Sequence, residues 1–124
     1  MLIENLYTLN AFNSQDNKVT ATIKINAVHT IFEGHFPGQP ILPGVCQLQI
    51  IKELLERAAG RKLLLSEAGN CKFLQMADPE KTSVLNIHID YLPSGAGISC
   101  NAVIKSGETV FLKMTAYFKY VHLA

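Results

Sequence analysis

The chain has 124 residues, 48% of them hydrophobic and 17% charged, which is typical of a globular protein. This length suits one domain with a buried core and is too short for two, so we expect a single domain over residues 1–124. The net charge of +1 argues against a nucleic-acid or membrane-surface partner, since either normally needs a basic excess.

The first half of the chain predicts a hairpin, a loop and a helix. Residues 6–12 can pair across a turn with residues 18–27, where apolar and polar side chains alternate. Prolines and glycines between Gly34 and Gly44 predict a shaped loop. From about Pro43 to Ala59 apolar residues recur at three- and four-residue steps, which predicts the one long helix of the chain.

The second half reads as sheet. The expected strand segments and turns are 63–65, 70–77, 85–91, a turn at 93–97, 98–104, a hairpin turn at 106–107, and 110–118. Two strands, one apolar helix and about four strands predict an α+β fold, with one helix against a mostly antiparallel sheet.

The segment from Gly34 to Val45 carries the chemistry; it reads Gly-His-Phe-Pro-Gly-Gln-Pro-Ile-Leu-Pro-Gly-Val. It places His35 in a proline-braced loop nine residues before Gly44, where the helix begins. A histidine can act as a base at cellular pH, and a helix N-terminus offers free N–H groups to a developing oxyanion. The residues alone leave open a purely structural role, in which His35 caps a turn and the prolines stiffen a loop.

This segment closely resembles the signature of the bacterial 3-hydroxyacyl-acyl-carrier-protein dehydratases, because the histidine, the three prolines and the three glycines fall in register. Lys72-Phe73 also resembles a strand motif of that family. The resemblance implies a hot-dog fold, in which a curved sheet wraps one helix. It also implies a homodimer or a trimer of dimers, an active site at the dimer interface, and a substrate carried by an acyl carrier protein.

The resemblance implies a role for each matching residue. His35 removes a proton from the carbon next to the thioester carbonyl, the Gly44 N–H holds the thioester oxygen, and the Ile41 carbonyl fixes the imidazole tautomer. A carboxylate on the partner subunit's helix helps the 3-hydroxyl leave as water, which yields a trans-2-enoyl thioester. The residues expected to line the substrate site are Phe32, Phe36, Pro43 and Val45.

The sequence departs from the family at that carboxylate. The family's acid lies fourteen residues after the histidine, where this chain has Gln49, and an amide cannot donate a proton as an acid. Glu53 lies one helical turn further, about 6 Å along the same face, so we predict that Glu53 supplies the acid, directly or through a water held by Gln49. Alternatively, both belong to a solvated polar stripe in which Glu53 pairs with Arg57.

Two further functions remain open. A hot-dog acyl thioesterase would use a helix carboxylate such as Glu53 to direct water, and a non-catalytic acyl-binding or partner subunit would explain Gln49.

The remaining expectations concern cofactors and location. No His, Cys, Asp or Glu spacing matches a metal site and no glycine-rich phosphate loop follows a strand, so we expect neither metal nor cofactor. Cys46, Cys71 and Cys100 form no close pair and are expected to be free, packed thiols. We expect a cytoplasmic protein, because the sequence has neither a signal-peptide pattern nor a membrane-length apolar run.

Overall fold

The computed structural model describes residues 4–33 and 40–121 of the chain. His35 and Phe36 lie outside the described residues. The elements are β1 (Tyr7–Gln15), β2 (Lys18–Ile25), the 3-10 helix η1 (Thr30–Phe32), α1 (Gly44–Ala59), β3 (Leu63–Phe73), β4 (Val84–Ser94), β5 (Gly97–Ser106) and β6 (Thr109–Tyr120).

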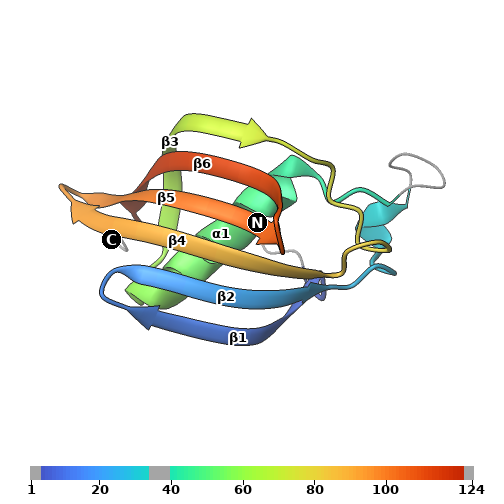
Figure 1. Cartoon of the computed structure of the whole chain (residues 1–124). Coiled ribbons are helices and arrows are strands. Elements are labelled where there is room, and N and C mark those ends of the chain that lie inside the picture. Colours follow the sequence, from blue (N-terminus) through green and yellow to red (C-terminus); the bar gives the residue numbers. More distant parts are fainter. Residues whose placement is uncertain (1–3, 34–39, 122–124) are drawn as a thin grey trace.

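The strands of the described ranges form one sheet in the order β1-β2-β4-β5-β6-β3, and every neighbouring pair is antiparallel. The sheet curves across α1, which lies behind it in the view of Figure 1. β1 and β3 are the two edge strands. One helix held by a curved antiparallel sheet is the hot-dog fold, which confirms the predicted α+β class.

The core lies between α1 and the inner face of the sheet. On β2, Val19, Ala21, Ile23 and Ile25 are buried, while the residues between them are exposed or half-buried. The same alternation buries one face of β4, β5 and β6, as their sequence pattern predicted. The helix contributes the buried side chains Cys46, Gln47, Ile50, Ile51, Leu54 and Leu55.

Both ends of α1 follow from local chemistry. Pro43 is the N-cap with extended backbone, and Gly60 ends the helix in the left-handed region with φ of 68°. The Gly60 N–H donates to the Glu56 carbonyl at 2.8 Å. Within the described residues, no helix has both the length and the apolar character needed to cross a membrane.

The largest difference from the prediction is β3. It runs without a break from Leu63 to Phe73, instead of forming two pieces over 63–65 and 70–77, and Ala77 lies beyond it. Register shifts follow Leu65 and Ala68, so strict alternation is lost along this strand. Because β3 is an edge strand with few buried side chains, its sequence carries little periodic signal.

We expect Leu55→Ala to lower the free energy of unfolding by about 2–5 kcal/mol, because Leu55 is fully buried and truncation leaves a cavity against the sheet. Leu92→Ala is the matched control, since Leu92 is 62% exposed and its loss should cost less than about 0.5 kcal/mol. Urea unfolding of both variants measures the difference. Equal losses would contradict the placement of the helix on the sheet.

Candidate functional site

The N-terminus of α1 presents backbone donors without a partner among the described residues. The Cys46 and Gln47 N–H groups donate to the Pro43 carbonyl at 3.0 and 3.1 Å. Among the residues that the structure describes, no acceptor lies within hydrogen-bonding distance of the Gly44 or Val45 N–H. The first turn also holds no acidic side chain. These N–H groups and the positive end of the helix dipole suit an oxyanion or a polarised carbonyl.

Gly44 lies under an aromatic ring, which a side chain at this position would displace. A Cβ built on Gly44 would lie 2.7 Å from the Cζ atom of Phe73. The end of β3 therefore contacts the start of α1. In the Lys72-Phe73 pair, Phe73 makes this contact. The ring shields one side of the helix start while 49% of the Phe73 side chain remains exposed.

The backbone leading into the helix is tied on two sides. The Leu42 N–H donates to the Ala77 carbonyl at 2.8 Å, and the Leu42 carbonyl accepts from the Gln47 side chain at 3.2 Å. Gln47 is only 3% exposed, and its Oε1 has no partner among the described residues. The sequence prediction missed Gln47, although its spacing of four from Ile51 places it on the buried helix face.

Glu53 is held through both of its carboxylate oxygens. The Tyr7 hydroxyl donates to Oε1 at 2.7 Å, and the Gln49 amide nitrogen donates to Oε2 at 2.9 Å. Burial, then the hydrogen bond to Glu53 and its negative charge, raise the pKa of Tyr7 well above its usual range, with Arg57 opposing them. Tyr7 therefore remains a phenol that donates. This contact brings the first residue of β1 into a cluster that the sequence analysis did not foresee.

The solvated-stripe alternative does not describe this helix face. Gln49 and Glu53 are half-buried, and the Arg57 guanidinium lies 5.5 Å from the centroid of the Phe12 ring. The Glu53–Arg57 pair of that alternative is not formed within the described ranges, where the ion pair on α1 joins Lys52 to Glu56 at 3.9 Å. Glu53 is therefore held by two neutral donors and not by an ion pair.

A hollow of about 600 Å³ opens beside the Glu53 cluster, at the C-terminal half of the helix. Tyr7 and Glu53 line it, and Arg57, Arg61 and Lys62 also contribute to its lining. The Arg61 guanidinium lies 3.7 Å from the centroid of the Tyr120 ring, which holds it at the helix end. The site thus combines the two carboxylates of Glu53 and Glu56, a phenol and several cationic groups.

The two parts of the predicted site lie apart within one chain. Nine residues separate Gly44 from Glu53, and at 1.5 Å per residue this is about 13.5 Å along the helix axis. The carbonyl oxygen and the 3-hydroxyl of one thioester are only a few bonds apart. The Cα atoms of Gly44 and Glu53 are therefore farther apart than these two groups of one substrate.

The other predicted substrate-binding residues differ in their surroundings. Phe32, 9% exposed, belongs to the hydrophobic core, whereas Val45 is 65% exposed beside the helix start. Pro43 is half-buried as the N-cap. A role for any of them in substrate binding stays a prediction, as it does for Phe36 outside the described residues.

The three cysteines are free thiols packed among other residues, as expected. Cys46 and Cys100 are buried and Cys71 is half-buried, and none forms a disulfide. Burial raises the pKa of Cys46, despite its place near the helix N-terminus, and raises that of Cys100 to about 11. Neither thiol is therefore an activated nucleophile.

His29 also has a structural role. Its Nδ1 accepts from the Ile31 N–H at 2.9 Å, and its Nε2 lies 2.7 Å from the Glu4 carbonyl. Both ring nitrogens are thus occupied by backbone groups, so His29 caps η1 and is not free to act as a base. Across residues 4–33 and 40–121, no three His, Cys, Asp or Glu side chains gather in a way that could hold a metal ion.

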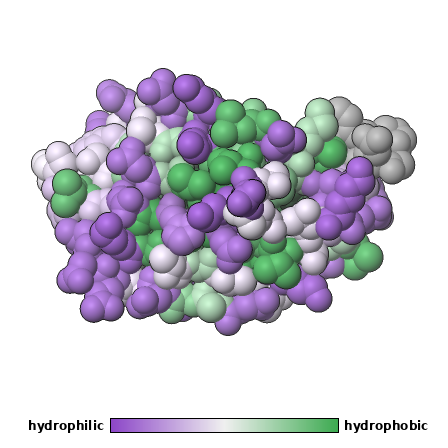
Figure 2. All heavy atoms as spheres, in the orientation of Figure 1, coloured by the Kyte–Doolittle hydropathy of each residue, from purple (hydrophilic) through white to green (hydrophobic). Residues whose placement is uncertain are grey.

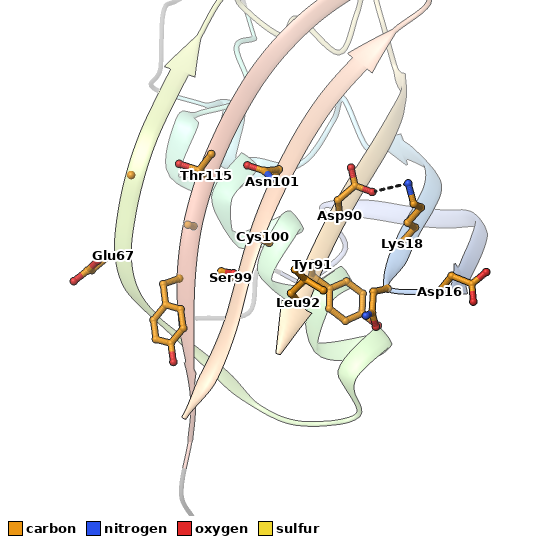
Figure 3. A pocket seen from close by; sticks show the side chains of 14 residues that line it. Asp16, Lys18, Glu67, Asp90, Tyr91, Leu92, Ser99, Cys100, Asn101 and Thr115 are labelled. Atoms are coloured by element: carbon orange, nitrogen blue, oxygen red, sulfur yellow. Dashed lines mark ion pairs between the residues drawn. The ribbon is translucent and has the colours of Figure 1, made fainter. Parts of the chain in front are cut away.

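A second hollow, of about 510 Å³, lies on the outer face of the sheet, away from α1. Figure 3 shows the Lys18–Asp90 ion pair, 3.5 Å long, at one side of it and Asn101 and Thr115 on the central strands. Both members of the ion pair are largely exposed. In Figure 2 hydrophilic residues cover most of this face, with groups of apolar residues between them. None of the predicted site residues lines this hollow.

Comparison with known families gives a clear result. The family model described as ApeI-like, ApeI dehydratase, matches residues 11–109. The chain belongs to the ApeI-like dehydratase family. The match includes the whole segment from Gly34 to Val45 and all of α1, which confirms the dehydratase resemblance of that segment.

Individual relatives agree with this assignment. The chain is 34% identical over 85 residues to the 3-hydroxyacyl-acyl-carrier-protein dehydratase FabZ of Clostridium acetobutylicum; the match covers 63% of this chain and 60% of that relative.

Solved structures share the fold. The dehydratase heterocomplex ApeI:P from Xenorhabdus doucetiae gives a TM-score of 0.71 at 17% identity, over 90% of this chain and 96% of that one. A hypothetical thioesterase from Streptococcus pneumoniae TIGR4, solved with coenzyme A, gives a TM-score of 0.65 at 16% identity, over 93% and 85% of the two chains. At these identities the likeness shows the fold alone.

We expect Gln47→Glu to destabilise the fold at pH 8 by about 1–3 kcal/mol, because a carboxylate there is buried and loses the donor to Leu42. Burial should raise the pKa of the introduced carboxyl above its unfolded value of about 4.3. The deficit should therefore be small near pH 4 and grow as the pH rises through the folded-state pKa.

Urea unfolding of Gln47→Glu at both pH values measures this deficit. The exposed Gln75→Glu is the matched control and should show little change at either pH. A Gln47→Glu deficit that is the same at both pH values would contradict the buried position of this side chain.

Proposed function

We propose that the chain dehydrates 3-hydroxyacyl thioesters, held on an acyl carrier protein, to trans-2-enoyl thioesters. The observation that carries this proposal is the open Gly44 N–H at the start of α1, directly after the dehydratase-like segment. The family assignment and the name of the Clostridium relative support the substrate class and the reaction. The match reaches 60% of that relative's length, so its carrier and substrate come to this chain only as part of the proposal.

In the proposed reaction His35 takes the proton from the carbon next to the thioester carbonyl. The electron pair left behind is delocalised onto the carbonyl oxygen, which accepts a hydrogen bond from the Gly44 N–H. The pair then forms the carbon–carbon double bond while the bond to the 3-hydroxyl breaks. Glu53, protonated before this step, delivers its proton to that hydroxyl, directly or through a water held by Gln49, so that it leaves as water. Transfer of a proton from His35 to Glu53, through solvent, then restores both groups.

The spacing of Gly44 and Glu53 supports a site shared between two copies of the chain. A partner's helix could bring its Glu53 to the thioester bound at Gly44, in place of the chain's own Glu53. The edge strand β3 supports such an assembly, because its outer edge has no partner among the described residues. Exposed apolar side chains follow this edge, including Leu64, Phe73 and Met76 at 62%, 49% and 70% exposed.

A non-catalytic partner subunit is the second candidate. Gln49 in place of the family's carboxylate favours it, and the similar Xenorhabdus structure is itself a heterocomplex. In this case the chain would pair with a different subunit that carries the acid. The thioesterase alternative has the weaker support of a shared fold with the Streptococcus protein, and release of free thiol would identify it.

Purified protein should convert a 3-hydroxyacyl carrier-protein thioester to the enoyl product, with little or none formed by His35→Ala.

Glu53→Gln should keep its fold and lower kcat by about 10²–10⁴-fold, the usual contribution of an acid or base. Mass spectrometry of the carrier-bound product measures both variants. No enoyl product across several chain lengths, and no free thiol, would favour the partner-subunit function; full activity of Glu53→Gln would exclude Glu53 as the acid.

Complementation tests the shared site. If His35 and Glu53 act across an interface, co-expressed His35→Ala and Glu53→Gln chains should form heterodimers with one intact site each. With random pairing the mixture should recover about a quarter of the wild-type activity, because half of the dimers are mixed and each has one active site of two. No recovery from a purified heterodimer would place both groups in a single chain.

A further inference from the structure

The Glu53 cluster joins two elements that are far apart in the sequence. Tyr7 is the first residue of β1, an edge strand, and it lies opposite Ile25 of β2 in the sheet register. Its hydroxyl reaches the Glu53 carboxylate at 2.7 Å across a separation of 46 residues. The sheet therefore presents a donor to the helix at this point.

The hydroxyl, not the ring, carries this contact. Burial of a phenol hydroxyl is unfavourable unless it forms a hydrogen bond, and a phenylalanine would fill the same half-buried space without that requirement. The raised pKa of Tyr7 keeps the hydroxyl protonated, so it donates to the carboxylate and does not repel it. With Gln49 as donor to the other oxygen, Glu53 is oriented by two neutral groups.

A glutamate side chain on a helix surface has several rotamers, and only some of them aim the carboxylate in one direction. Hydrogen bonds to both oxygens select one of these rotamers, which is what a group that must meet a particular atom requires. Arg57 is the cation that the sequence places near Glu53, and it is engaged with Phe12 instead. The Glu53 carboxyl group is thus oriented by two neutral donors and not by an ion pair.

We propose that Tyr7 is a positioning residue: its hydroxyl holds the Glu53 carboxylate in the orientation in which it serves the leaving 3-hydroxyl of the substrate. The inference rests on the proposed dehydratase function. Tyr7 acts through Glu53 and has no contact with the reacting atoms. Its loss should therefore lower kcat and leave KM nearly unchanged.

Kinetics of Tyr7→Phe test the proposal, since this change removes only the hydroxyl. We expect kcat on a 3-hydroxyacyl carrier-protein thioester to fall about tenfold, the loss typical of one hydrogen bond to a charged group, with KM within about twofold of wild type. Tyr117→Phe is the matched control. It removes a tyrosine hydroxyl that donates to the Ser94 carbonyl at 2.6 Å, away from Glu53, and should leave kcat unchanged.

A second background separates positioning from general structural support. Glu53→Asp keeps a carboxyl group but withdraws it by one methylene, beyond the reach of the Tyr7 hydroxyl. If Tyr7 acts only through Glu53, adding Tyr7→Phe to Glu53→Asp should lower kcat no further. A tenfold loss in both backgrounds, or wild-type kcat in Tyr7→Phe, would overturn the proposal while the dehydratase function stands.

Inactivity of the wild-type protein has a different meaning. It would overturn the proposed dehydratase function, and the positioning role that rests on it. A double-mutant cycle of Tyr7→Phe and Glu53→Gln on the free energy of unfolding would still show whether the two side chains interact. The two failures are therefore distinguishable.

Discussion

The packing of the apolar face of α1 against the concave face of the sheet is the interaction on which the rest of the structure depends. Ile51 and Leu55 of the helix are fully buried, and they meet a sheet face built from alternating residues of β2, β4, β5 and β6. This contact sets the position and direction of the helix axis. The open N–H groups at Gly44 and the carboxylate of Glu53 are consequently placed by the same interface.

The helix also fixes the spacing between two chemical groups. Its N-terminus offers backbone donors to an oxygen, and an oriented carboxylate belongs to Glu53, about 13.5 Å further along the helix axis. This separation of Cα positions exceeds the few bonds between the reacting atoms of a thioester. The edge position of β3 leaves exposed apolar side chains beside the sheet.

The two glutamines of the helix lie in different surroundings, one buried and one on the polar face. Gln47 faces inward, where its amide nitrogen supports the Leu42 carbonyl just before the helix. Gln49 faces the polar side, where its amide nitrogen donates to Glu53. Gln49, which stands where the dehydratases have a carboxylate, therefore has Glu53 as its hydrogen-bond partner in this chain. A carboxylate at position 49 would face Glu53 with the same charge, so Gln49 and Glu53 are chemically matched as a pair.

Local patterns in the sequence determined the strands, the helix and its two ends, because alternation, apolar spacing, Pro43 and Gly60 act over a few neighbouring residues. The segment from Gly34 to Val45 likewise indicated the family without any structure. The tertiary structure alone decided the continuous β3, the ring of Phe73 over Gly44 and the contact between Tyr7 and Glu53. Each of these joins residues that are far apart in the chain, so their contact depends on the order of strands in the sheet, which no local pattern encodes.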